Sequence, residues 1–229
     1  MKKILSYFSL FEWILLFGSI IVITVSFFVF HNTEYFYLFS SILGVISLAF
    51  LAKGSPIGMV LTIIFSLMYA NISYTNQYYG EMITYVGMTG VIATITLVSW
   101  IRHPSKRSKN EVEIHDDLKW KEYVFLFFLS SAVTVGFYFV LKYLNTNNLI
   151  VSTISIFTSF TASYLALRRC RFYALVYVVN DIVLIVLWSM ATVENMSYLA
   201  ITICFITFLI YDFYSFINWT RLQKKQKSE

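Results

Sequence analysis

Two polar residues, Asn180 and Asp181, stand side by side in the middle of an otherwise apolar stretch, residues 172–192. About 20 helical residues span the roughly 30 Å hydrocarbon core of a bilayer, so this stretch has the length of a transmembrane helix. A carboxylate at that depth is energetically costly unless it faces a bundle interior or a water-filled cavity. The pair is therefore a candidate for a ligand site inside the membrane.

Helical spacing places further side chains that could bind a ligand on the face that carries Asp181. Residues three and four positions apart share a helix face, and here they are Tyr177, Asp181, Leu184 and Trp188, with Asn180 beside them. An acid, an amide and two aromatic rings on one face can bind a flat organic molecule, and a cationic one in particular. The alternative is structural, because a protonated Asp181, or one hydrogen-bonded to neighbouring helices, would only hold the bundle together.

The composition places these residues in a membrane protein. Of the 229 residues, 59% are hydrophobic and only 13% are charged, whereas a soluble domain averages about 25% charged residues. The net charge of +5 lies in short loops and not along one face, which argues against nucleic-acid binding. The apolar segments contain no HExxH, P-loop or nucleophile–base motif and no metal-ligand cluster, so we expect neither an enzyme nor a bound metal or cofactor.

Eight apolar segments are expected to cross the membrane as helices. They cover residues 12–30, 35–52, 57–75, 82–101, 121–143, 149–167, 172–192 and 197–219. Lysine and arginine residues, beginning with Lys2 and Lys3, concentrate in the loops of one side, and only Lys142 falls on the other. By the positive-inside rule both termini are cytoplasmic, with Ser105 inside and Asn147 outside.

Two segments outside the apolar spans are rich in charged residues. The loop of residues 102–120 is basic in its first half and acidic in its second, where Asp116 and Asp117 lie, and we expect a solvated linker. Residues 220–229 form a basic tail that is expected to touch anionic lipid headgroups.

The two halves of the chain resemble each other. When Lys53 is aligned with Arg168, polar residues of the third segment align with the residues of the helix face that carries Asp181. The aligned pairs are Thr62–Tyr177, Ser66–Asp181, Tyr69–Leu184 and Ser73–Trp188. The sequence SWIR near residue 100 also matches NWTR near residue 219. Residues 35–101 and 149–219 would then be parallel three-helix repeats with a substrate near the midplane, at the repeat interface.

Several sequence motifs resemble those of the PnuC-type vitamin transporters. They are LAKGSPIGMV, TNQYYGEM and SWIR in the first half, and LALRRCRFYALVYVVND and YDFYSFINWTRL in the second. The resemblance covers residues 40–222 and implies a SWEET-like fold: two parallel three-helix bundles joined by a linker helix, residues 121–143, with residues 12–30 as an extra N-terminal helix. It also implies a homotrimer and facilitated diffusion of nicotinamide riboside, with relatives that carry thiamine, riboflavin or deoxynucleosides.

The same resemblance relates individual residues to the family's motifs. Asn180 matches the membrane asparagine of the seventh helix, and Asn218 with Trp219 matches a terminal tryptophan pattern. The chain departs from the family at Tyr173 and Tyr177, where tryptophan is common, and in the last helix, where an asparagine is common. Together with the helix faces above, the predicted substrate-binding residues are Asn180, Asp181, Tyr177, Trp188, Tyr173, Ser66, Tyr69, Tyr211, Asp212 and Asn218.

Two of these assignments have structural competitors. Asp212 lies nearer the cytoplasmic end than Asp181, and hydrogen bonding between helices is the favoured role for it. The hydroxyl residues of the sixth segment, Thr158 among them, are expected to pack and not to bind. The acid beside aromatic rings favours a cationic pyridinium or thiazolium ring as the substrate.

The resemblance therefore implies a facilitator in the bacterial inner membrane that imports a vitamin-like nucleoside, with nicotinamide riboside as the first candidate, and we expect it to work without ion coupling. The chain contains no ATPase module and no cluster of sodium ligands, and Asp181 and Asp212 are the only acids expected deep in the membrane. A cytoplasmic kinase would trap the substrate by phosphorylation and keep influx running. The alternative from another class is a membrane sensor or accessory subunit whose polar residues only hold helices together.

Overall fold

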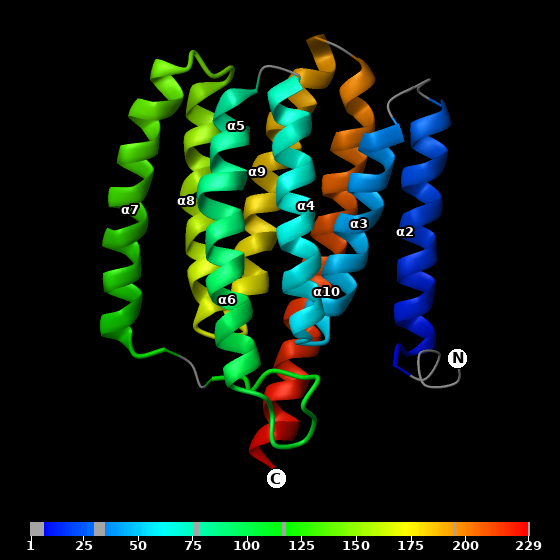
Figure 1. Ribbon diagram of the computed structural model, residues 1–229, viewed down its shortest axis with the longest axis vertical. Helices are drawn as coiled ribbons and strands as arrows, with labels where there is room; N and C mark the ends of the chain where they lie inside the picture. The colour runs from blue at the N-terminus through cyan, green and yellow to red at the C-terminus, as the bar shows by residue number, and fades with distance from the viewer. Residues whose placement is uncertain (1–6, 30–34, 76–77, 116–117, 195, 229) are drawn as a thin grey trace.

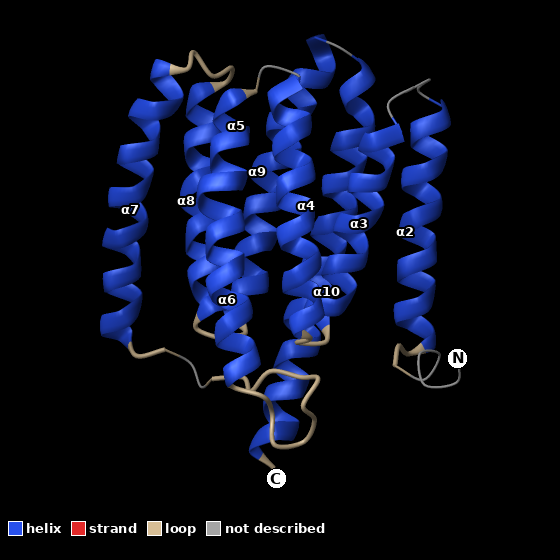
Figure 2. Cartoon of the chain, viewed as in Figure 1, coloured by secondary structure: helices blue, strands red, loops and turns tan. Residues whose placement is uncertain are grey.

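Long helices dominate the computed structural model, which describes residues 7–29, 35–75, 78–115, 118–194 and 196–228. Apart from one isolated β-bridge, these described residues form helices and connecting loops (Figure 2). In chain order the helices are α2 (Leu10–Val29), α3 (Tyr35–Ala52), α4 (Pro56–Thr75), α5 (Tyr79–Ile83), the π-helical η1 (Thr84–Gly90), α6 (Val91–Arg102), α7 (Trp120–Tyr143), α8 (Leu149–Leu167), α9 (Phe172–Glu194), the 3₁₀-helical η2 (Met196–Tyr198) and α10 (Leu199–Lys227). Lys2, Lys3, Asp116 and Asp117 lie outside the described residues.

Within this described part of the chain, eight spans have the length and apolar composition needed to cross a membrane. The fourth span combines α5, η1 and α6, and each of the others is a single helix. A helix satisfies its backbone polar groups internally, which the hydrocarbon core requires. Large apolar side chains such as Phe39, Phe128 and Phe213 are exposed on the outside of the bundle, where acyl chains would cover them. The predicted all-α polytopic membrane fold is confirmed.

The helices form two groups that pack against each other. One group contains α3, α4, α5, η1 and α6, and the other contains α8, α9 and α10. Contacts of α10 with α3 and of α6 with α8 join the groups. At one edge of the bundle α7 packs on α8, and at the other α2 packs on α3 and α10 (Figure 1). These contacts are compatible with two parallel repeats, a linker helix and an extra N-terminal helix, and the repeats themselves remain a prediction from the sequence.

The helix α2 begins and α10 ends at the same end of the bundle, which is called the basal end below; the opposite end is called apical (Figure 1). The charged loop after α6 lies at the basal end, so the positive-inside rule predicts that this end faces the cytoplasm. Ser105 in this loop is buried, with 5% of its surface exposed, and cannot report accessibility. Asn110 in the same loop and Asn147 in the apical loop before α8 are both exposed.

Single cysteines at Asn110 and Asn147 are expected to react from opposite sides of the membrane. With Cys170 and Cys204 replaced by alanine, an impermeant maleimide should label Asn147→Cys in intact cells and Asn110→Cys only after permeabilisation. Both variants replace an exposed loop asparagine, so each controls for the other. Labelling of Asn110→Cys alone in intact cells would contradict the predicted orientation.

Two tryptophans join the helix groups reciprocally at the basal end. Trp100 in α6 donates its indole N–H to the Ala166 carbonyl in α8 at 3.0 Å, and Trp219 in α10 donates to the Leu51 carbonyl in α3 at 2.9 Å. Leu51 and Ala166 are equivalent in the alignment of the two halves. Both indoles are fully buried, and their ring centroids lie 5.3 Å apart. Each group therefore supplies one donor and one acceptor to this contact at the basal end.

The loop after α6 is not the solvated linker that its charges suggested. Val112, Ile114 and Leu118 are buried and pack in the same apolar cluster as the two tryptophans. The side chain of Gln226 accepts a hydrogen bond from the Ile114 N–H at 2.9 Å and donates to the Val112 carbonyl at 3.1 Å. The predicted tail is likewise helical, because α10 continues to Lys227. Alternating apolar residues in EVEI let the loop bury Val112 and Ile114 while Glu113 between them stays exposed.

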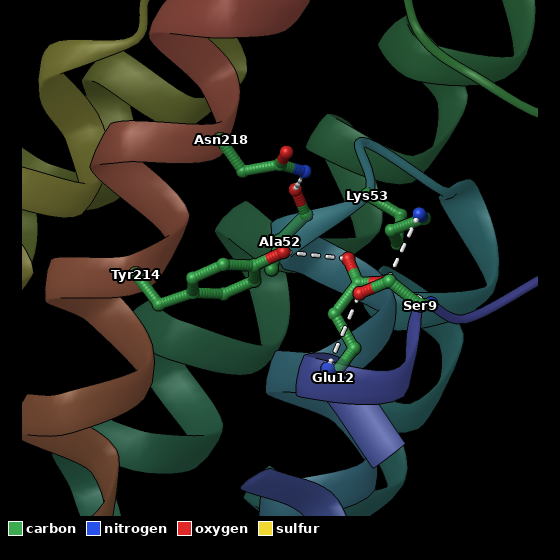
Figure 3. Close-up of polar contacts among 6 residues, drawn as sticks. All are labelled: Ser9, Glu12, Ala52, Lys53, Tyr214 and Asn218. Carbon is green, nitrogen blue, oxygen red and sulfur yellow. Dashed lines mark hydrogen bonds and ion pairs between the residues drawn. The ribbon is translucent and has the colours of Figure 1, made fainter. Parts of the chain in front are cut away.

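A buried acid fastens α2 to the rest of the bundle (Figure 3). Ser9 and Glu12 form a capping box, in which the Ser9 N–H donates to Glu12 Oε2 at 2.6 Å and the Glu12 N–H donates to Ser9 Oγ at 3.3 Å. Lys53, just after α3, lies 3.3 Å from Glu12 Oε2. The Tyr214 hydroxyl of α10 donates to Glu12 Oε1 at 2.7 Å. One carboxylate thus connects α2 with both helix groups.

Replacing Glu12 with glutamine is expected to lower the thermal stability of the protein. The change removes the ion pair with Lys53 and weakens the charge-assisted hydrogen bonds, which contribute about 1.5–3 kcal/mol each. The melting temperature in detergent should fall by several degrees, whereas Glu194→Gln, at an exposed acid on the apical end of α9, should leave it unchanged. Equal melting temperatures for the two variants would contradict the anchoring role.

Candidate functional site

A cavity of about 100 Å³ lies between the two helix groups. Its walls come from α3, α4, η1, α6, α8, α9 and α10. The polar residues of the wall are Ser47, Thr62, Thr89, Thr96, Ser159, Ser163, Asn180, Asp181 and Asp212, and its aromatic residues are Phe65, Tyr85, Tyr173, Tyr177, Phe205 and Phe208. Among the described residues that line the cavity there is no lysine, arginine or histidine. The site is therefore apolar and aromatic, with acidic and amide groups at defined places.

Asp181 and Asp212 form an acidic pair in this cavity. Both are buried, with 3% and 4% of their surface exposed, and their carboxyl groups interact. Asp181 Oδ2 has no hydrogen-bond partner among the described residues, although it is buried. Two acids this close in a low-dielectric site repel each other when ionised, and a bound cation relieves the repulsion. The structure thus places Asp212, for which the sequence favoured a helix-packing role, in the same cavity as Asp181.

The Asn180 side chain is held by two hydroxyl groups of α8. Thr158 Oγ1 donates to Asn180 Oδ1 at 2.7 Å, and Ser159 Oγ donates to the same oxygen at 2.8 Å. The sequence predicts only a packing role for Thr158, and no sequence pattern singles out Ser159. Both lie in a segment rich in serine and threonine, where a hydroxyl that reaches another helix looks no different in sequence from one that bonds its own backbone.

Tyrosines supply much of the aromatic wall. The Tyr177 hydroxyl lies 2.9 Å from Ser163 Oγ, and Tyr173 donates to the Leu51 carbonyl at 3.4 Å while its ring packs on Trp219. Tyr85, which no sequence pattern singles out, enters the cavity from η1. A π-helical turn shifts the side-chain register within a helix and is often found at functional sites. The sequence gives no periodicity that signals such a turn.

Half of the predicted site residues line the cavity and half do not. Asn180, Asp181, Tyr177, Tyr173 and Asp212 line it, whereas Ser66, Tyr69, Trp188, Tyr211 and Asn218 lie elsewhere. The Ser66 hydroxyl donates to the Ile63 carbonyl of its own helix at 2.8 Å. Asn218 donates to the Ala52 carbonyl at 2.7 Å, at the basal end of α3 (Figure 3). Tyr211 lies against Ser19 of α2, on the side of α10 away from the cavity.

Trp188 and Tyr69 belong to an aromatic cluster on the apical side of the cavity. The Trp188 ring lies 5.3 Å from Tyr78, 5.6 Å from Tyr198 and 6.3 Å from Tyr69, measured between centroids. Burial raises the pKa of Tyr78 to about 12, so its hydroxyl is neutral at physiological pH. This aromatic cluster lies on the apical side of the cavity, and the tryptophan pair lies on its basal side.

More acids are buried in the spans than the sequence suggested. Besides Asp181 and Asp212, Glu12 is buried at the basal end of α2 and Glu81 at the apical end of α5, with 6% and 4% of their surface exposed. Both stand at the ends of apolar segments, where a sequence pattern cannot distinguish a buried from a solvated acid. The expectation of only two embedded acids is corrected accordingly.

Two comparisons with known proteins both match transporters of nicotinamide compounds. The family model described as nicotinamide mononucleotide transporter matches residues 34–221, which include every wall of the cavity and exclude α2. The nicotinamide riboside transporter PnuC of Neisseria mucosa is 24% identical over 223 residues, which are 95% of this chain and 82% of that relative.

A solved structure shares the fold. The crystal structure of the vitamin B3 transporter PnuC superimposes with a TM-score of 0.83 at 23% sequence identity, and the match covers 96% of this chain and 94% of the other. The arrangement of helices around the cavity is therefore one that a known protein also adopts.

Proposed function

Because the chain belongs to the nicotinamide mononucleotide transporter family, we propose that it imports nicotinamide riboside across the bacterial inner membrane. The relative from Neisseria mucosa is named for this substrate. The membrane-spanning fold and the family place the chain among transporters.

The acidic pair is the observation that carries the proposal. Asp181 and Asp212 line an aromatic cavity that no basic residue lines, within the described residues. The nicotinamide ring of the riboside is a pyridinium cation, which both carboxylates and aromatic faces attract. A phosphate group would meet repulsion there, so the cavity favours the nucleoside over its mononucleotide.

Thiamine is the second candidate substrate, and the same observation favours it. Its thiazolium ring is also a flat cation, whereas riboflavin and deoxynucleosides carry no charge for the acidic pair to recognise. Binding of nicotinamide riboside and thiamine to the purified protein, compared by thermal shift, separates the two, because a bound ligand raises the melting temperature. A protein that binds neither would fit the alternative of a sensor or accessory subunit.

The proposed mechanism is alternating access without ion coupling. The cavity lies between the apical aromatic cluster and the basal Trp100–Trp219 pair. Opening one layer at a time would expose the substrate to one side at a time, with its own gradient as the driving force. Phosphorylation by a cytoplasmic kinase would keep the internal free concentration low. We also propose that both termini lie in the cytoplasm, which follows from the charge asymmetry. A homotrimeric assembly is proposed from the family resemblance.

Uptake into liposomes that contain the purified protein tests this function. We expect nicotinamide riboside to equilibrate across the liposome membrane without an imposed ion gradient. Counterflow should appear when the lumen is preloaded with the substrate. Voltage must be held at zero, because it acts directly on a cation. Uptake no faster than in empty liposomes would contradict transport. Accumulation driven by a proton or sodium gradient would contradict uncoupled transport and would direct attention to Asp181, Asp212 and Glu81.

A further inference from the structure

We infer that Thr158 and Ser159 are positioning residues that hold the Asn180 amide with its oxygen on α8 and its NH₂ group toward the cavity. The inference rests on the proposed function, since it concerns how the same cavity recognises its substrate. It assigns a role to two hydroxyl groups, one of which, Thr158, does not itself line the cavity.

The geometry around Asn180 Oδ1 leaves the oxygen little capacity for another partner. A carbonyl oxygen has two lone pairs, and the two hydroxyl oxygens approach Oδ1 to 2.7 and 2.8 Å from consecutive residues of α8. Thr158 Oγ1 also lies 3.0 Å from the Ser155 carbonyl and 3.2 Å from the Ile154 carbonyl, but its single hydrogen has the shortest contact with Asn180. Asn180 is 4% exposed and lines the cavity beside Ser159.

This use of hydroxyls differs from the local pattern in α8. Thr153, for example, donates to the Leu149 carbonyl of its own helix at 2.7 Å, the usual arrangement of a threonine in an apolar helix. Thr158 also has carbonyls of its own helix within reach, but Thr158 and Ser159 both make their shortest hydrogen bond to Asn180 in α9. Their hydroxyls therefore act on the orientation of a side chain in another helix.

The orientation decides what the cavity offers a substrate. With Oδ1 occupied, Asn180 offers N–H donors in the same cavity as Asp181 and Asp212, whose ionised carboxylates only accept hydrogen bonds. With the amide turned around, its oxygen would join the carboxylates, and an acceptor group of the substrate would find no donor from Asn180. The site therefore fits a cationic ring that also carries a neutral acceptor, such as a carbonyl or hydroxyl oxygen.

A double-mutant cycle on the full-length protein tests the role. Thr158→Val and Ser159→Ala remove the hydroxyls singly and together, with Asn180 intact or replaced by alanine. The dissociation constant for nicotinamide riboside is measured by calorimetry. We expect each single variant to bind less than about threefold more weakly and the double variant about tenfold more weakly. In the Asn180→Ala background, removing both hydroxyls should change affinity by less than about twofold.

Conservative and matched variants exclude a general packing effect. Thr158→Ser keeps the hydroxyl and should bind as the wild type does, whereas Thr153→Val removes a hydroxyl of the same helix that bonds only locally and should leave affinity unchanged. Wild-type affinity in the Thr158→Val, Ser159→Ala double variant would overturn the inference. An equal loss with and without Asn180 would overturn it too.

Thermal unfolding of the same proteins keeps the inference separate from the proposed function. The contact predicts non-additive changes in melting temperature between the hydroxyl variants and Asn180→Ala, with or without a ligand. If the wild type binds neither nicotinamide riboside nor thiamine, the proposed function fails, while this coupling still supports the contact. Additive melting temperatures would then overturn the positioning role as well.

Discussion

Nicotinamide riboside is expected to bind the Asp181→Asn variant about ten- to a hundredfold more weakly than the wild type, because a charge-assisted contact contributes roughly 1.5–3 kcal/mol. Asp181 Oδ2 is buried in the cavity wall and has no hydrogen-bond partner among the described residues, so it is the acceptor most available to a ligand. Asparagine keeps the shape and the hydrogen-bonding capacity but removes the charge. The dissociation constant from calorimetry on the purified protein measures the loss.

Variants of other acids show whether the effect belongs to the cavity. Asp212→Asn should weaken binding less, since Asp181 remains, and the double variant should weaken it more than either single one. Glu12→Gln, at a buried acid outside the cavity, should leave affinity unchanged even where it lowers stability. Wild-type affinity in a well-folded Asp181→Asn protein would return Asp181 to the structural alternative, in which it only holds helices together.

Replacing both basal tryptophans with phenylalanine is expected to open the cavity to the basal side. Each Trp→Phe change deletes an indole N–H and leaves the buried carbonyl of Leu51 or Ala166 without that donor, at a cost of at least about 1 kcal/mol per bond. Both hydrogen bonds form only in the state in which the two helix groups are in contact at the basal end, so their loss destabilises that state alone. The double variant should therefore shift the equilibrium toward the basal-open state by roughly thirtyfold.

Cysteine reactivity in the cavity measures this shift. A cysteine at Ala93, a small residue of the cavity wall, is introduced in a background without Cys170 and Cys204. An impermeant thiol reagent added from the basal side should modify it at least about tenfold faster in the Trp100→Phe, Trp219→Phe protein. Trp120→Phe, at an exposed tryptophan of the same end, is the matched control and should have no effect. Equal rates in all three proteins would contradict the closing role.

Local features of the sequence were sufficient to predict the membrane spans. Their signal is the length and apolar composition of each segment, and bilayer thickness makes that signal independent of how the helices pack. The same reasoning identified Asn180 and Asp181, because polar groups at mid-membrane depth are costly wherever a helix lies. Ser9 and Glu12 carry a capping-box pattern that could have predicted the earlier start of α2.

Which residues meet in the cavity depended on the rotation and depth of each helix relative to its neighbours. Asp181 and Asp212 lie together because α9 and α10 turn these faces toward the same space, whereas Asn218, further along α10, meets the carbonyl of Ala52 instead. Helix periodicity states which residues share a face but not which neighbour that face will meet.

Burial at the ends of the spans was also decided by tertiary contacts. Glu12 is buried because Lys53 and Tyr214 reach it from other parts of the chain, and the loop residue Val112 is buried because α10 extends far enough to cover it. An acid or a charged loop at the end of an apolar segment has the same sequence pattern whether water or protein surrounds it. The sequence by itself determined what crosses the membrane and which groups are unusual there; the partners of those groups come from distant segments, so only the packed structure could assign them.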